Sequence, residues 1–222
     1  MESVLIAAVS AVQAYLLGSI DTGILVSKFL YHDDVRKYGS GAAGMTNMLR
    51  TFGKKAAALT AFGDVLKGVL AVCIGRWLFT LMPESTTLSP YLAVYLAAIF
   101  AIIGHLKPLY FGFKGGKGVL VGAVMLAFFD WRVFVIAFAL FILSVVLTKW
   151  ISLGSILGAV SFPITTWLFY RDPVLTAMAF GMAAAVVFMH RSNIGRILHG
   201  TENKFSFKSK KTIEASPDGE EK

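Results

Sequence analysis

The stretch VFVIAFALFILSVVLTK, residues 133–149, carries its only charge at the last position, Lys149. A run of this length and composition is typical of a helix that crosses a bilayer, for which about 20 apolar residues suffice. The whole chain shares this bias, since it is 56% hydrophobic and 15% charged, with a mean hydropathy of +0.70. Soluble domains contain about 25% charged residues. The sequence therefore indicates an integral membrane protein that has lipid as its main solvent.

Other apolar runs extend this pattern and predict an all-α fold, an integral membrane helical bundle of about seven transmembrane helices. The predicted spans lie near residues 4–27, 56–80, 90–105, 118–130, 133–149, 153–170 and 173–190. The fourth is short, so an even number of spans stays open. A polar, glycine-rich loop is expected at about 31–55. Residues 1–205 are expected to form one membrane-embedded domain, and residues 206–222 a disordered cytoplasmic tail.

The distribution of positive charge predicts the orientation, because basic residues that flank spans are retained in the cytoplasm. Of the 21 lysines and arginines, only Arg76, Arg132 and Arg171 fall near one face of the predicted bundle. We therefore expect the N-terminus outside and the C-terminus in the cytoplasm. The polar segments described next then all reach the cytoplasmic face.

The first of these segments is GSGAAGMTN at residues 39–47, closed by Arg50. Glycines allow successive N–H groups to point at one spot, while hydroxyls, an amide and a guanidinium add donors for anionic oxygens. Ser40, Thr46, Asn47 and Arg50 are therefore candidate site residues. The alternative is a flexible loop whose arginines only hold it in the cytoplasm.

The second segment is DVLKG at residues 64–68, in which Asp64 and Lys67 are three positions apart on one predicted helix face. Two interpretations stay open for this pair. It is either a structural ion pair at the head of a span or part of the site.

The third segment is KGGKG at residues 114–118, where the chain enters the short fourth span. Its backbone can approach a phosphate closely, and a helix N-terminus favours negative charge there. Gly115, Gly116 and Lys117 are thus candidate phosphate-binding residues, although an interfacial lysine that snorkels to water is the alternative. A Walker A loop is excluded, because position 118 is glycine where that motif needs Ser or Thr.

The fourth segment is HRSNIGR at residues 190–196, which follows the last span. His190 and Asn193 share a helix face and are candidates for the site. A histidine at a helix end is equally often a partner of the helix dipole. Ser155, at the start of the sixth span, is on spacing alone an ordinary capping serine.

Several other chemistries lack support in the sequence. His105, His190 and His199 have no neighbouring acid along the chain, so we expect no metal site and no cofactor. No G-x-S-x-G elbow is present, and no histidine is followed at the fifth position by aspartate, which argues against covalent serine and histidine–aspartate acyl transfer. We also expect no nucleic-acid partner.

Taken in order, the conspicuous segments resemble the bacterial acyl-phosphate:glycerol-3-phosphate acyltransferase family, seven-span enzymes of the cytoplasmic membrane. The resemblance covers roughly residues 15 to 205. It includes LGSI at 17–20, DVRKYGSG at 34–41, TNMLR at 46–50, DVLKG at 64–68, GH at 104–105, FKGGKG at 113–118, SLGS at 152–155, HRSNIGR at 190–196 and GTE at 200–202.

This resemblance implies a transferase of phospholipid biosynthesis that moves a fatty acyl group from acyl-phosphate to the 1-hydroxyl of glycerol 3-phosphate. The products would be lysophosphatidic acid and phosphate, with no coenzyme A or carrier protein. The implied catalytic residues are Lys117, His190, Ser40 and Arg50. The implied substrate-binding residues are Thr46, Asn47, Ser155 and Asn193, to which the loop described above adds Gly115 and Gly116.

The chain departs from the family pattern at two positions. Asp21 follows Gly-Ser-Ile where the family has proline, and Ala42 stands where the family has asparagine. Two other classes of protein also stay open. Short, glycine-broken helices with cationic ends are found in transporters of phosphorylated solutes or lipids. A non-catalytic lipid-binding scaffold would fit if Ala42 marks lost activity.

Overall fold

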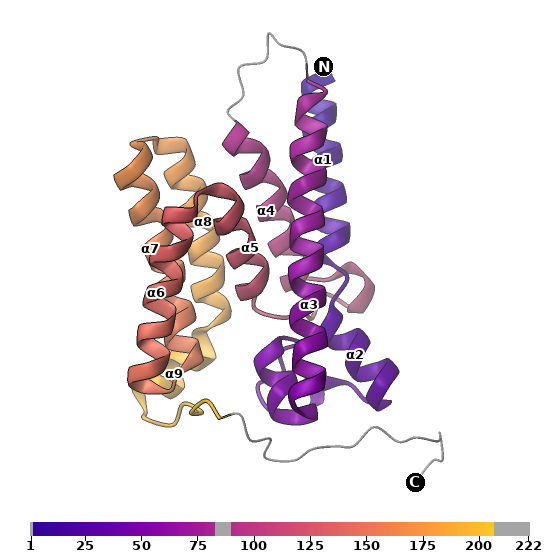
Figure 1. Ribbon diagram of the computed structural model, residues 1–222. Helices are drawn as coiled ribbons and strands as arrows, with labels where there is room; N and C mark the ends of the chain where they lie inside the picture. The colour runs from indigo at the N-terminus through magenta and orange to yellow at the C-terminus, as the bar shows by residue number, and fades with distance from the viewer. Residues whose placement is uncertain (1, 83–89, 207–222) are drawn as a thin grey trace.

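The computed structural model describes residues 2–82 and 90–206, in which every regular element is a helix (Figure 1). The α-helices are α1 (Glu2–Gly18), α2 (Thr22–Tyr31), α3 (Met45–Thr80), α4 (Pro90–Leu106), α5 (Val119–Phe129), α6 (Trp131–Thr148), α7 (Ile151–Tyr170), α8 (Pro173–Met189) and α9 (Arg191–Leu198). Two 3-10 helices are η1 (Val35–Lys37) and η2 (Leu109–Phe111). The all-α prediction is therefore confirmed for this part of the chain. The predicted tail lies outside the described residues after Ser206.

Several helices have the length and composition of membrane spans. In residues 2–82 and 90–206, five helical segments are long and apolar enough to cross a bilayer, or six if α8 and α9, bent by 60°, count as one span. α5 is apolar but has only 11 residues. The helical membrane bundle thus agrees with prediction, while the count of seven stays a prediction that depends on α5.

The first predicted span, residues 4–27, is broken into α1 and α2 at Asp21. The Asp21 carboxylate accepts a hydrogen bond from the Ile24 N–H at 3.2 Å and so caps α2. The carbonyl of Ile20, released from the helical ladder, accepts one from Lys67 Nζ at 2.9 Å. The Ile24 N–H and the Ile20 carbonyl, both freed by the break, thus find partners inside the protein, as a membrane interior requires.

The second predicted span, residues 56–80, begins earlier than expected. α3 starts at Met45, so the prediction of a loop through residue 55 is wrong for its last eleven residues. Gly53, with φ of 86°, kinks this first part of the helix. Its polar residues suggested a solvated loop, whereas they lie at a partly buried helix start.

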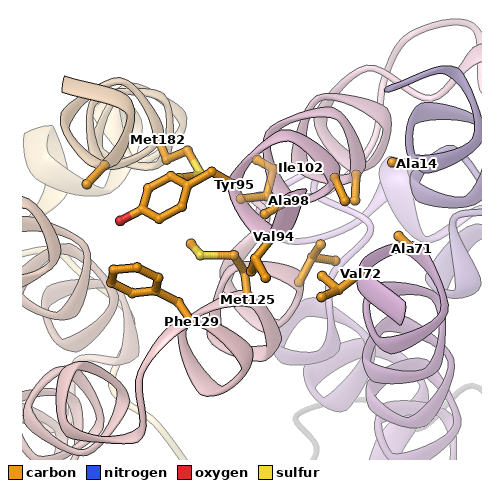
Figure 2. Packing of buried hydrophobic residues seen from close by; sticks show 14 of the residues in the cluster. Ala14, Ala71, Val72, Val94, Tyr95, Ala98, Ile102, Met125, Phe129 and Met182 are labelled. Carbon is orange, nitrogen blue, oxygen red and sulfur yellow. The ribbon is translucent and has the colours of Figure 1, made fainter. Parts of the chain in front are cut away.

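α5 lies between two groups of helices, with α1, α3 and α4 on one side and α6, α7 and α8 on the other (Figure 1). The groups meet around Tyr95 of α4 and Phe129 of α5, whose ring centroids are 4.9 Å apart (Figure 2). Phe162 of α7 stacks on Tyr95 at 5.7 Å, and Met182 of α8 closes the cluster. This apolar core holds the two groups together in the half of the bundle nearer the N-terminus.

Glycines bring α1 and α4 into backbone contact. A Cβ on Gly18 would lie 2.2 Å from the Ala101 carbonyl oxygen, and one on Gly104 would lie 2.3 Å from that of Tyr15. Any larger residue would force these helices apart. The close approach fixes His105, the residue after Gly104, relative to the break between α1 and α2.

Candidate active site

A pocket of about 150 Å³ opens at the end of the bundle that holds α2, the start of α3 and α9 (Figure 1). Most of the predicted site residues line it, although they come from four separate segments: Ser40, Thr46, Asn47, Arg50, Lys117, Ser155, His190 and Asn193. Gly115 and Gly116 do not line the pocket. They pack against His105, so that a Cβ on either would lie 2.1 Å from an atom of that residue.

The loop before α3 takes its shape from Asn47. The Asn47 side-chain nitrogen donates, at 3.0 to 3.2 Å, to three carbonyls, those of Val35, Tyr38 and Ala42. Its oxygen accepts from the Ser40 N–H at 3.2 Å. Gly39 has φ of 55°, and a Cβ there would lie 2.3 Å from the Asn47 oxygen, so only glycine fits. Asn47 lines the pocket, but its amide is engaged in holding the loop that presents Ser40.

Arg36 connects this loop to the segment around KGGKG at residues 114–118. Its guanidinium pairs with the Asp34 carboxylate at 2.7 Å and donates to the carbonyls of Phe111 at 2.7 Å and Lys114 at 3.0 Å. The sequence placed Arg36 only among the cytoplasmic basic residues. Its role in joining two walls of the pocket depends on contacts across more than seventy positions of the chain.

Lys117 lies at one end of a chain of polar contacts. Its Nζ donates to Asn193 Oδ1 at 2.5 Å, and Asn193 Nδ2 donates to Glu202 Oε1 at 2.8 Å. Glu202 also accepts from Ser152 Oγ at 2.8 Å and from Arg196 Nε at 2.7 Å. Sequence reasoning placed Glu202 beside the fourth segment without a role, yet it anchors this whole wall.

Burial, neighbouring charges and hydrogen bonds in this wall shift the pKa values of Lys117 and Glu202. Burial, followed by the nearby Arg196 charge, lowers the pKa of Lys117 to about 8. Burial opposes ionisation of Glu202, but hydrogen bonds from Asn193, Ser152 and Arg196 outweigh it and lower the pKa of that carboxyl. In this wall Glu202 therefore stays ionised, while Lys117 loses its charge as the pH rises through about 8.

His190 lines the pocket, and within residues 2–82 and 90–206 only one of its two ring nitrogens has a hydrogen-bond partner. The side chain is buried, and its Nδ1 lies 2.8 Å from the Val186 carbonyl oxygen. A carbonyl only accepts, so Nδ1 carries the proton and Nε2 keeps a lone pair. Arg50 also lines the pocket, is half-buried and donates to the Asn203 carbonyl at 3.4 Å.

Asp64 and Lys67, which their spacing paired on one helix face, form a buried cluster with His105, which spacing did not place beside them. Lys67 Nζ lies 2.8 Å from Asp64 Oδ1 and 2.9 Å from His105 Nδ1. His105 has no acidic neighbour along the chain, but in the folded protein its Nδ1 is 3.7 Å from the same carboxylate oxygen. The partner comes from another helix, α3, beyond the reach of spacing rules. Asp64 and His105 both line the pocket.

A second, apolar pocket of about 160 Å³ adjoins the polar one. The two share lining residues, namely Gly118, Val119, Leu120, Phe141 and Ser155. In residues 2–82 and 90–206, no three histidine, cysteine or acidic side chains are grouped so as to hold a metal ion. Together the two pockets suit a ligand with anionic oxygens at one end and an alkyl chain at the other.

Comparison with known proteins identifies relatives over most of the chain. A family model described as "Glycerol-3-phosphate acyltransferase" matches residues 8–200. A glycerol-3-phosphate acyltransferase of Clostridioides difficile is 42% identical over 198 residues, which are 89% of this chain and 95% of that protein. A protein of the same name from Thermoanaerobacter sp. is 38% identical over 203 residues, 91% of this chain and 98% of its own.

Solved structures agree with the sequence relatives. The chain is similar to the crystal structure of PlsY, an integral membrane glycerol 3-phosphate acyltransferase, in its glycerol 3-phosphate form. The TM-score is 0.79 at 31% identity, and the match covers 90% of this chain and 96% of that one. The lysophosphatidic acid form of PlsY gives a TM-score of 0.75 at 29% identity, covering 94% of this chain and 97% of the other.

Proposed function

The chain belongs to the glycerol-3-phosphate acyltransferase family, and from that premise we propose that its acyl donor is acyl-phosphate. In this reaction the acyl carbon–oxygen bond to phosphate breaks and a bond to the 1-hydroxyl of glycerol 3-phosphate forms. The hydroxyl proton ends on the released phosphate, and lysophosphatidic acid is the other product. Acyl-phosphate is a mixed anhydride with a good leaving group, so positioning and charge neutralisation suffice for catalysis.

The observation that carries the proposal is the junction of the polar pocket with the apolar one. A donor with a phosphate headgroup and a long tail can place its acyl carbon at the shared residues, between Gly118 and Ser155. Lys117 and Arg50, which both line the polar pocket, supply positive charge there. Two phosphorylated substrates repel one another, and these cations offset the repulsion in a site partly shielded from water.

The pocket residues divide between the two substrates. Ser40, Thr46, Lys117 and Ser155 bind the acyl-phosphate headgroup, while Arg50, His190 and Asn193 orient glycerol 3-phosphate. Asn47 acts through the loop it holds, because its amide hydrogen bonds are already used by backbone groups. Gly115 and Gly116 likewise contribute by letting the backbone before Lys117 pass close to His105.

A phosphate oxygen of the donor is the better candidate for the base. His190 Nε2 has a lone pair, but its Nδ1 is held by the carbonyl of Val186 and not by a carboxylate that would stabilise an imidazolium. Uptake of the proton by the leaving phosphate needs no such partner. His190 then serves to orient the attacking hydroxyl.

We also propose that the enzyme lies in the bacterial cytoplasmic membrane with seven spans. The charge bias supports an orientation with the N-terminus outside and the pocket on the cytoplasmic side. In this arrangement α5 is a short span, and Lys114 and Lys117 at its start are cytoplasmic. Soluble glycerol 3-phosphate then reaches the site from the cytoplasm, while the donor arrives within the bilayer.

The test is direct turnover by purified protein in nanodiscs with palmitoyl phosphate and labelled glycerol 3-phosphate. We expect lysophosphatidic acid and inorganic phosphate in equal amounts. Palmitoyl-coenzyme A in place of palmitoyl phosphate is the matched control and should give no product. Product formed only from palmitoyl-coenzyme A would show that the acyl donor is acyl-coenzyme A and not acyl-phosphate. Uptake of glycerol 3-phosphate into proteoliposomes without any product would favour a transporter.

A further inference from the structure

We propose that His105 is an additional substrate-binding residue, whose Nε2–H donates a hydrogen bond to a phosphoryl oxygen of the acyl-phosphate headgroup. Lys67 acts behind it as a positioning residue that fixes the imidazole in the donating form. The inference rests on the proposed function for the identity of the ligand. The tautomer of His105 and its position at the pocket follow from the structure.

The tautomer follows from the contacts of Lys67. Its ammonium forms an ion pair with Asp64, whose Oδ1 is 2.8 Å away, and its N–H groups donate to the Ile20 carbonyl at 2.9 Å and approach His105 Nδ1 at 2.9 Å. An ammonium only donates, so Nδ1 of His105 must accept and carries no proton. The proton of the neutral ring is therefore on Nε2.

The cluster is buried enough to keep this arrangement. Asp64, Lys67 and His105 are 2%, 4% and 3% exposed. The Asp64 carboxylate balances the Lys67 ammonium, and the carbonyl of Ile20 is available only because the helix breaks before α2. A reversed tautomer would set an N–H of His105 against an ammonium, which has no lone pair to accept it.

The Nε2 atom of His105 lies beside Gly116, in the KGGKG segment at residues 114–118. A Cβ on Gly116 would lie 2.1 Å from His105 Nε2, and the Gly116 N–H donates to the His105 carbonyl at 3.1 Å. In the part of the chain that the structure describes, Nε2 has no hydrogen-bond partner, and His105 lines the polar pocket together with Lys117. The pocket therefore gains a neutral donor beside Gly116, the residue that precedes Lys117.

A neutral donor suits this position. Lys117 and Arg50 already provide charge, and a further cation beside them would lower the affinity of Lys117 for its own proton. An imidazole locked as a donor adds a directed hydrogen bond to an anionic oxygen without that penalty. Gly115 and Gly116 are then required because His105 fills the space where their side chains would lie.

The first test reads the tautomer directly, by nitrogen NMR of protein labelled at its histidine rings. Protonated and unprotonated ring nitrogens have well-separated shifts, and a His105→Gln sample assigns the signals. We expect Nε2 protonated and Nδ1 unprotonated, with a shift of the Nε2 resonance when a non-transferable alkyl acyl-phosphonate is added. A proton on Nδ1, or no response to the phosphonate, would overturn the inference.

The second test separates a binding role from a structural one. His105→Gln keeps an N–H near the position of Nε2 and should retain most activity, whereas His105→Leu should lose about 10- to 100-fold in kcat/KM, as for a lost hydrogen bond to a charged group. His199→Leu, at an exposed site, is the matched control. If His105→Leu folds and matches wild type, the inference is wrong. Failure of wild type to form lysophosphatidic acid would instead overturn the proposed donor, since the NMR readout needs no turnover.

Discussion

The amide of Asn193 faces Lys117 with its oxygen because Glu202 holds the opposite side of that amide. Asn193 Oδ1 accepts from Lys117 Nζ at 2.5 Å, while Nδ2 donates to Glu202 Oε1 at 2.8 Å. The carboxylate cannot donate, so it fixes the orientation of the amide. The neutral amide thus fixes the position of the Lys117 ammonium without cancelling its charge, which stays available to an anionic ligand.

Replacing this neutral spacer by an acid should cancel that charge. Asn193→Asp keeps the shape of the side chain but puts a carboxylate against Lys117 and close to Glu202. We expect kcat/KM to fall at least about 100-fold, or about 3 kcal/mol of transition-state stabilisation. The measurement is steady-state kinetics on protein shown to be monodisperse. Activity close to wild type would mean that the charge of Lys117 is not used.

Lys117 itself should be essential to turnover and not to folding. Lys117→Ala should lose at least about 100-fold in kcat, near 3 kcal/mol. Lys117→Arg should stay clearly impaired, because the wider guanidinium fork does not replace a compact ammonium in this site. Lys114→Ala is the matched control, since Lys114 lies in the same loop with an exposed side chain. Equal rates for all three variants would identify Lys117 as an interfacial anchor.

Activity should decline as the pH rises through about 8. Burial lowers the pKa of Lys117 to about 8, so the free enzyme carries the positive charge below that pH and loses it above. The alkaline limb of kcat/KM should have its midpoint there, because that ratio reports the free enzyme. In Lys117→Arg the guanidinium stays charged, so its residual activity should show no such limb. An unchanged limb in that variant would assign the titration to another group.

Restoring the amide that the family has at position 42 should strengthen substrate binding. Ala42 lines the pocket, and its own carbonyl accepts a hydrogen bond from the Asn47 side chain. Ala42→Asn should lower KM for one of the two substrates by about 3- to 10-fold, the value of one net hydrogen bond. Ala42→Leu, similar in volume but without the amide, is the control and should not. Improvement by both variants would indicate packing and not hydrogen bonding.

The orientation can be tested with thiols in the described residues. In a Cys73→Ala background, Thr80→Cys at the end of α3 should react with an impermeant maleimide added outside intact cells. Lys204→Cys, after α9, should react only once the membrane is opened. The opposite pattern would invert the topology.

Hydropathy predicted the simple helices well. The spans at 133–149, 153–170 and 173–190 correspond closely to α6, α7 and α8, because continuous apolar composition determines where such helices begin and end. It missed the break at Asp21 and the start of α3 at Met45. Both depend on tertiary partners, Lys67 for the broken helix and the pocket walls for the polar helix start.

The site was predictable as a set of residues but not as a set of contacts. Glycine-rich and basic segments marked Ser40, Lys117 and Asn193, which the structure brings to one pocket. Pairing across helices leaves no local periodicity, so the approach of His105 to Asp64 and Lys67 was invisible to spacing. The block Asp64 to Gly68 and the pair Gly104 and His105 were the available signals.

The shortness of α5 sets the depth at which chemistry takes place. Its 11 residues rise only about 16 Å, roughly half of a hydrocarbon core of about 30 Å. Its far end leads to the ion pair of Asp130 and Arg132, at 2.7 Å. In the proposed seven-span arrangement this pair lies at the outer interface, and Lys117 at the near end of α5 would then lie below the plane of the lipid headgroups. A lipid donor can react without lifting its tail towards water, and its lipid product can leave sideways into the leaflet from which the donor came.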